Sequence, residues 1–215
     1  MRKLVALLAG LISIAALSGA GHMPPPKMAS FTPEQRAQLD KISAYLNSIR
    51  TLKGSFVQLD PNGNLEEGDF YLEKPGRMRF EYRPPSAVLV VSDGDTVAVK
   101  NTKLRTVDRY PLTDTPLDLL LGDKIDLNHN IALTGMSEQP GALVVRARSQ
   151  SSHAQGDISI VFAQQPLELR QWTVVDAQGL ATTVALRAVQ SGVDIPGSLF
   201  VLRDEKNPFA RKGEE

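Results

Sequence analysis

Hydrophobic and polar side chains alternate along residues 68–82 of this 215-residue chain, on both sides of a Pro-Gly dipeptide. Phe70 and Leu72 share one side of the first arm, and Met78 and Phe80 take the same places in the second arm. Successive side chains of a strand point to opposite faces, so the pattern predicts a β-hairpin with one apolar and one charged face. The Pro-Gly dipeptide supplies the turn.

Short runs of the same kind fill most of the remaining chain. They are rich in β-branched and aromatic residues and are separated by turn residues, which is typical of β-strands. Besides the two arms of the hairpin, the predicted strands are residues 52–58, 87–91, 96–100, 103–109, 131–135, 143–148, 158–162, 168–175 and 181–189, with a further edge strand at 199–202. About eleven strands spaced roughly ten residues apart indicate one large antiparallel sheet.

One segment has a strong helical period instead. Thr32 is a predicted helix N-cap, with Pro33 at the first helical position and Gln35 placed to complete a capping box. Apolar residues then recur at spacings of three and four, namely Leu39, Ile42, Tyr45, Leu46 and Ile49. The pattern predicts an amphipathic helix over residues 33–48. Residues 116–121 (PLDLLL) interrupt the strand pattern and predict one or two helical turns.

A sheet of this size curls to bury one face, and the helix is the natural cover for its open side. That face can collect Phe56, Phe70, Leu72, Met78, Phe80, Tyr82, Val88, Val90, Phe162, Trp172, Val174 and Leu186. Taken alone, the pattern favours an ordinary closed core made of these side chains. No repeat and no alternation of strands with helices divides the chain, so we expect a single domain over residues 31–203.

The N-terminus has the pattern of an export signal. Arg2 and Lys3 precede an apolar run at residues 4–17, and Ser18 and Ala20 fit the positions before a cleavage site. Since a membrane-spanning helix needs about 20 apolar residues, cleavage after Ala20 is favoured over an uncleaved anchor. We expect a flexible tether over 21–30, which contains three consecutive prolines, and a disordered charged tail over 204–215.

Charge and cysteine content narrow the function classes. Without Arg2 and Lys3, the chain keeps 22 basic and 24 acidic residues, a formal net charge of −2, which argues against nucleic acid as a partner. The chain has no cysteine. The protein must therefore be stable without disulfides, and it has no thiol to which a lipid anchor could be attached.

The residues that could carry catalysis are few and scattered. His22, His129 and His153 have no second ligand at metal-binding spacing, and the pair Glu66-Glu67 belongs to a polar, solvated stretch. Nucleophile-elbow, phosphate-loop and dinucleotide motifs are missing from the sequence. We therefore predict neither a catalytic site nor a metal or cofactor site.

Five segments, in order, resemble the periplasmic outer-membrane lipoprotein carrier family, the LolA-like proteins. They are residues 54–58 (GSFVQ), 68–82 (GDFYLEKPGRMRFEY), 88–97 (VLVVSDGDTV), 116–121 (PLDLLL) and 172–179 (WTVVDAQG). The resemblance extends from about residue 31 to residue 202. It implies an incomplete antiparallel β-barrel, mainly β, covered by the N-terminal helix and short helical turns.

The resemblance also implies a function. Such carriers are monomeric, non-enzymatic periplasmic chaperones that take acylated lipoproteins from an inner-membrane ABC transporter and deliver them to an outer-membrane acceptor. The apolar residues named above, Phe162 excepted, would then form the wall of a cavity for acyl chains. The expected lid residues are Leu39, Ile42, Tyr45 and Leu46.

Relatives of this family carry an arginine just before the hairpin proline, where it holds the lid shut. Lys74 occupies that position here, and a lysine lacks the planar five-donor fork of arginine. Arg77 and Arg79 alternate with the apolar residues, so we expect them on the outer face. Three alternatives stay open from the sequence: a module that senses or carries free lipid or glycolipid, an enzyme, and a scaffold with a filled barrel.

Overall fold

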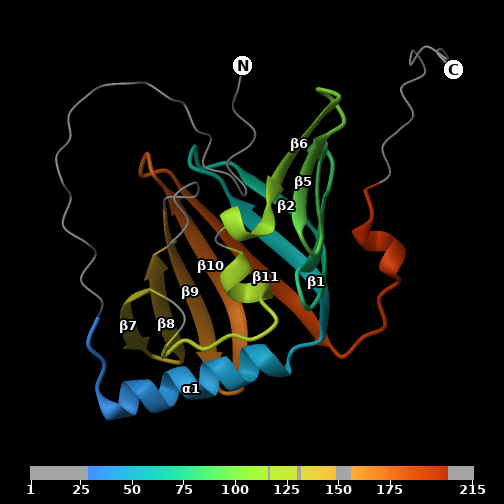
Figure 1. Ribbon diagram of the computed structural model, residues 1–215. Helices are drawn as coiled ribbons and strands as arrows, with labels where there is room; N and C mark the ends of the chain where they lie inside the picture. The colour runs from blue at the N-terminus through green and yellow to red at the C-terminus, as the bar shows by residue number, and fades with distance from the viewer. Residues whose placement is uncertain (1–28, 116, 130–131, 149–155, 203–215) are drawn as a thin grey trace, which may run out of the picture.

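The strands of this protein form one continuous antiparallel sheet (Figure 1). A computed structural model describes residues 29–115, 117–129, 132–148 and 156–202. The strands are β1 (Thr51–Leu59), β2 (Leu65–Glu73), β3 (Arg77–Tyr82), β4 (Val88–Asp93), β5 (Thr96–Asn101), β6 (Thr106–Pro111), β7 (Leu133–Gln139), β8 (Ala142–Arg148), β9 (Gly156–Gln164), β10 (Leu167–Asp176) and β11 (Ala181–Ser191). The predicted signal peptide, residues 21–28 of the predicted tether and the predicted tail lie outside the described residues.

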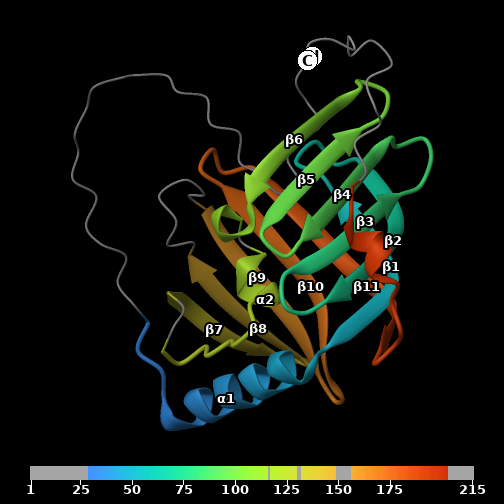
Figure 2. The same ribbon diagram turned by 45° about the vertical axis from the view of Figure 1, so that its right-hand side comes forward.

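The sheet consists of two meanders that meet in the middle. Strands β1 to β6 are neighbours in chain order, as are β7 to β11, and the pairing of β1 with β11 joins the two sets. Strands β6 and β7 are the two edges, so the sheet is open. Its curvature produces a concave face, with α1 lying across one end and α2 on the concave side (Figures 1 and 2). The predicted mainly-β open architecture is confirmed.

Helix α1 (Pro33–Ser48) has the predicted boundaries, and its N-terminus has the predicted cap. The Thr32 side chain accepts a hydrogen bond from the Gln35 amide, and the Gln35 side chain accepts one from the Thr32 amide. These bonds satisfy backbone donors that have no partner within the helix. The predicted helical turns within 116–121 are α2 (Asp118–Leu121), preceded by the 3-10 helix η1 (Leu112–Asp114).

The predicted edge strand at 199–202 is wrong. Residues Gly197–Phe200 form the 3-10 helix η2, which packs against β3 and β4 on the outside of the sheet. Phe200 is buried there, and the Leu199 carbonyl accepts a hydrogen bond of 3.0 Å from Nη1 of Arg79. Phe200 is therefore the residue of this run that is buried against the back of the sheet, and the run does not extend an edge. Arg79 lies on the outer face, as predicted from its alternation.

Two other strands are displaced from their predicted bounds. The strand expected at 103–109 begins at Thr106, because the preceding residues turn and Arg105 adopts a left-handed conformation at φ 55°. The strand expected at 131–135 covers Leu133–Gln139, and Ile131 lies outside the described residues. The other predicted strands match observed strands to within a few residues at each end.

Candidate functional site

The hairpin of β2 and β3 supplies one wall of the concave face. Phe70 pairs with Phe80 and Leu72 pairs with Met78, so four large side chains from two strands point to the same side. The Phe70 and Phe80 rings are stacked, with centroids 5.9 Å apart. Phe80 also meets Trp172 of β10 edge to face at 6.1 Å. Strands β3 and β10 are not neighbours, so this contact spans the inside of the curved sheet.

Two glycines allow these rings to lie close to the sheet. A Cβ on Gly68 would come within 2.5 Å of the Phe56 ring and within 2.2 Å of the Glu81 carbonyl oxygen. A Cβ on Gly54 would come within 2.8 Å of the Phe70 ring. In the sequence, both glycines fit ordinary strand alternation, which gives no sign that they pack against the aromatic wall.

Between this wall and the helices lies a nearly filled cavity, which we call the lid cavity. It is lined by Leu46, Ile49, Leu52, Phe70, Leu72, Lys74, Met78, Phe80, Leu117, Leu120, Leu121, Leu169, Trp172 and Leu186. Its free volume is about 20 Å³, which is room for roughly one water molecule. The side chains of α1 and α2 thus fill the concave face in this conformation.

The residues predicted for the cavity wall divide into two groups. Six line the lid cavity: Phe70, Leu72, Met78, Phe80, Trp172 and Leu186. Phe56, Tyr82, Val88, Val90 and Val174 do not line it, but they belong to the same apolar cluster or pack against it, as does Phe162. Tyr82 is buried, which raises its pKa well above the usual value, and its hydroxyl donates to Oε1 of Gln58 at 2.8 Å.

The helical cover is made of two elements. Leu39, Ile42 and Leu46 of α1 are buried, and Tyr45 is half-buried, with its hydroxyl accepting from the Leu169 amide at 3.0 Å. The resemblance implies that short helical turns belong to the cover, but the sequence named no site residue within them; Leu117, Leu120 and Leu121 all line the lid cavity. The signal for them was the apolar spacing within PLDLLL, which is too short to identify the face that it buries.

Lys74 connects the hairpin to α1, and the turn beside it connects the hairpin to α2. Its Nζ donates to the Leu46 carbonyl of α1 at 3.0 Å, and its amide donates to the Arg50 carbonyl at 2.8 Å. Two residues on, the Gly76 amide donates to the Leu121 carbonyl of α2 at 3.0 Å. Burial lowers the pKa of Lys74, with nearby Asp123 acting in the opposite direction. Lys74 is the one ionisable side chain among the residues that line the lid cavity.

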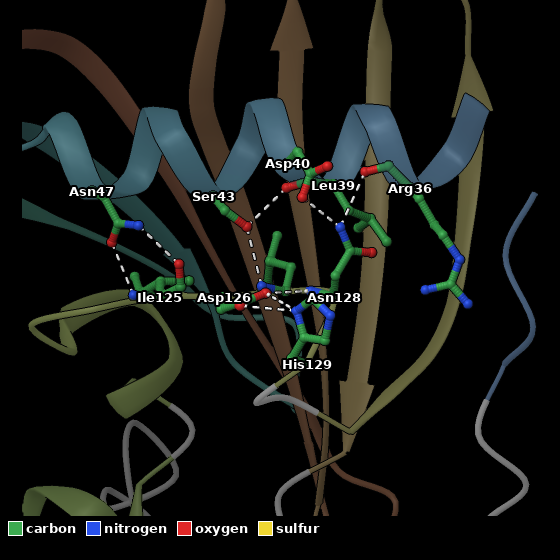
Figure 3. Close-up of polar contacts among 10 residues, drawn as sticks. Arg36, Leu39, Asp40, Ser43, Asn47, Ile125, Asp126, Asn128 and His129 are labelled. Carbon is green, nitrogen blue, oxygen red and sulfur yellow. Dashed lines mark hydrogen bonds and ion pairs between the residues drawn. The ribbon is translucent and has the colours of Figure 1, made fainter. Parts of the chain in front are cut away.

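A polar contact joins α1 to the segment that follows α2 (Figure 3). Asn47 donates from Nδ2 to the Ile125 carbonyl at 2.8 Å and accepts from the Ile125 amide at 2.9 Å. One turn earlier, Oγ of Ser43 accepts from the Leu127 amide at 3.1 Å. Asn128 then donates to Oδ1 of Asp40 at 2.6 Å. We call residues 122–129 the strap, since they fasten α2 to one face of α1.

In the described part of the chain, the residues that could carry catalysis or bind a metal do not gather into a site. His129 is exposed, and its Nδ1 lies 2.9 Å from Asp126, a hydrogen bond that holds the pKa of that carboxyl below its usual value. His22 and His153 lie outside the described residues. Across the described ranges, no three His, Asp or Glu side chains gather where they could hold a metal ion. Nor does any helix there combine the length and hydrophobicity that a membrane crossing requires.

The chain is similar in sequence to proteins of a known family. Residues 47–203 match the family described as "Outer membrane lipoprotein carrier protein LolA". An outer-membrane lipoprotein carrier protein of Alkalilimnicola ehrlichii is 29% identical over 176 residues, covering 78% of this chain and 80% of that protein. Another, from Chromohalobacter salexigens, is 29% identical over 178 residues, covering 77% and 82%. Among solved structures, a DUF1329 family protein from Desulfovibrio piger aligns with a TM-score of 0.49 at 11% identity, covering 78% of this chain and 96% of that one.

Proposed function

The chain belongs to the LolA family of outer-membrane lipoprotein carrier proteins, and from that membership we propose that it carries lipoproteins by exchanging their acyl chains for its own lid. The family is periplasmic and non-enzymatic, and its cargo is lipoprotein. The observation that carries the proposal is the lid cavity, where apolar residues of α1 and α2 cover a wall of Phe70, Phe80 and Trp172. Cargo would take the place of the lid against this wall.

The filled cavity provides the energetic condition for such exchange. Burying an acyl chain stabilises a complex by about 0.8 kcal/mol per methylene group, which for a long chain is on the order of 10 kcal/mol. Release would then be very slow. Here Leu46, Leu120 and Leu121 already bury the same wall, so cargo gains only the difference between its own contacts and those of the lid. That difference permits both uptake and delivery.

We assign the lid latch to Lys74. Its Nζ bond to the Leu46 carbonyl and the neighbouring Gly76–Leu121 backbone bond support this role, because together they hold both helices to the hairpin turn. A single ammonium donor makes a weaker and less directional attachment than an arginine fork. The latch in this protein is therefore easier to open than one made by arginine.

The transport route that we propose also follows from membership in the family. We propose that residues 31–203 form the carrier domain and that export is followed by cleavage after Ala20. The domain then receives acylated lipoproteins from an inner-membrane ABC transporter and passes them to an outer-membrane acceptor. In this scheme the carrier acts as a monomer, without a cofactor.

A release assay tests the function. Inner-membrane vesicles that contain acylated lipoproteins and the releasing transporter are incubated with the purified protein, and the supernatant is analysed by mass spectrometry. We expect acylated lipoprotein to leave the membrane in complex with the protein. Release of phospholipid or glycolipid alone, or of no lipidated species, would contradict the proposal.

Matched variants locate the activity on the concave face. Phe80→Glu and Leu72→Glu place a charge in the lid cavity, where it disfavours an acyl chain. Leu72 is only partly buried, so its variant is the less destabilising of the two. Leu59→Glu is the control, since Leu59 is already 42% exposed. We expect folded cavity variants to lose cargo while the control retains it; retained cargo in a folded Leu72→Glu protein would exclude this face.

A further inference from the structure

A second hollow lies outside the lid, beside the C-terminal end of α1. Its volume is about 460 Å³, and it is bounded by the end of α1, the start of β1, the β9–β10 turn and the end of β11. Its apolar side chains are Tyr45, Ile49, Leu52, Pro166, Leu167 and Val189. We call the space defined by these residues the outer groove. Pockets that hold small ligands have volumes of about 300–1,000 Å³.

A β-bulge in β11 forms one side of the outer groove. Ser55 pairs with Arg187 and Lys53 with Gln190, so β11 has one residue more than β1 in this interval. The extra residue lets Arg187 and Ala188 both face solvent, after which Val189 returns to the side that packs against the core. Ala188 adopts φ 50°, which is uncommon for a residue other than glycine. Bulges of this kind redirect side chains and are frequent beside binding sites.

A second bulge lies at the same end of the neighbouring strand. Leu169 pairs with Phe162 and Gln171 with Val161, which leaves Arg170 as an extra residue of β10. Leu169 is therefore on the same side as Trp172, and Leu167 follows it toward α1. The hydroxyl of Tyr45 accepts from the Leu169 amide, so the helix is bonded to the strand beside its bulge. The adjacent strands β10 and β11 therefore each have a bulge near the C-terminal end of α1.

The outer groove and the lid cavity share a wall. Ile49 and Leu52 line both spaces, and both are buried. They belong to the junction where α1 ends and β1 begins. A movement of α1 that displaced Ile49 and Leu52 would therefore join the two spaces. The outer groove is already open while the lid cavity is filled.

We propose that the outer groove is a preformed subsite for an acyl chain of the cargo, which engages it before the lid moves and continues from it into the lid cavity. This inference rests on the proposed carrier function. The apolar residues suit a hydrocarbon chain, and the polar edge formed by Ser48, Arg50 and Glu168 suits the ester and amide groups at its head. A peptide strand is excluded as the occupant because β10 and β11 are each paired on both sides and offer no free edge.

Photo-crosslinking on the unaltered protein tests the site. The probe is a synthetic lipopeptide with a diacylglyceryl cysteine whose acyl chains carry a diazirine. After irradiation, peptide mapping by mass spectrometry locates the adducts. We expect adducts at Leu167 or Val189, which line only the outer groove, in addition to adducts at Phe70 or Phe80 in the lid cavity.

A binding measurement with the same lipopeptide provides a second, independent readout. Val189→Asp polarises the outer groove and should weaken binding about tenfold, since it removes apolar contact with the chain. Leu180→Asp is the control, because Leu180 is 44% exposed in the β10–β11 turn, and it should bind within about twofold of the unaltered protein. Val189→Ser, a smaller change, replaces Val189→Asp if that variant does not fold.

The outcomes separate this inference from the proposed function. If the unaltered protein binds the lipopeptide but adducts form only in the lid cavity and the Val189 variants bind normally, the subsite is wrong and the carrier function stands. If the unaltered protein does not bind the lipopeptide, both are overturned. Adducts in both places together with weakened binding by the Val189 variants would support the subsite.

Discussion

Lys74 is where a single side chain connects the sheet to its lid. Its Nζ donates a hydrogen bond to the Leu46 carbonyl. This is one of the last carbonyls of α1, for which the helix itself supplies no N–H donor. A cation is also favoured at this end by the helix dipole. The burial that lowers the pKa of Lys74 shows that the ammonium gives up part of its hydration to make this contact.

Substitution of Lys74 should change how often the lid opens. Lys74→Met removes the bond to Leu46, a loss of roughly 1 kcal/mol, and should raise hydrogen exchange across residues 33–48 about fivefold. Lys74→Arg offers more donors and should lower exchange and slow cargo uptake. Hydrogen–deuterium exchange with mass spectrometry measures the exchange rates of both variants, and the release assay measures their rates of cargo uptake.

Lys41→Met is the control for this pair, since Lys41 is an exposed lysine on the same helix. It should leave both exchange and uptake unchanged. If the two Lys74 variants and the control behaved alike, Lys74 would have no role in holding the lid.

Gly68 is a residue whose missing side chain matters. Gly68→Ala would place a Cβ against the Phe56 ring and the Glu81 carbonyl, so we expect a loss of about 1–3 kcal/mol in the free energy of unfolding. Gly135→Ala is the matched change in another strand, with no atom within 4 Å of the added Cβ, and should shift stability by less than about 0.5 kcal/mol. Urea denaturation of the two variants gives the comparison, and equal stabilities would contradict the packing described for the aromatic wall.

At the scale of elements, we propose that the lid consists of α1, α2 and the strap, which move together. Asn47, Ser43 and Asp40 recur on one face of α1 and bond to successive residues of the strap (Figure 3). Between these bonds, Ile125 and Leu127 are buried in the core. Polar contacts therefore join the helix to the strap, while the apolar residues of both face the sheet.

Removing one of these contacts should loosen both parts of the lid. Asn47→Ala leaves the Ile125 amide and carbonyl without their partner, which destabilises the closed lid by about 1–3 kcal/mol. Hydrogen exchange should then rise together in residues 33–48 and in the strap. Ala44→Ser, an exposed change on the same helix, is the control. A rise confined to the strap would show that the two elements open separately.

The sequence predicts these elements better than it predicts their contacts. Alternation at Phe70 and Phe80 identifies the hairpin and its apolar face, and the capping pattern at Thr32 locates the start of α1. The residues around Ala188 carry no sequence pattern that predicts the bulge, since the bulge depends on how β11 pairs with β1. The run at 199–202 looks like a strand, but its position is decided by burial of Phe200 behind the sheet and by Arg79.

At the scale of the whole molecule, an open sheet has an apolar concave face that must be covered. Helices α1 and α2 cover it in the structure described here, leaving about 20 Å³ unfilled. The sequence alone could not distinguish such a cover from an ordinary closed core, because both bury the same residues. In the structure, α2 lies on the concave side and the hairpin turn is bonded to both helices. That this cover is removable is our proposal.

A crystal structure of the protein with a bound diacylated lipopeptide tests this account most directly. We predict acyl-chain density against Phe70, Phe80 and Trp172, in the space that Leu46, Leu120 and Leu121 now fill, with the bond between Lys74 and Leu46 broken. Acyl chains bound only outside the sheet, with the lid cavity and that bond unchanged, would contradict it.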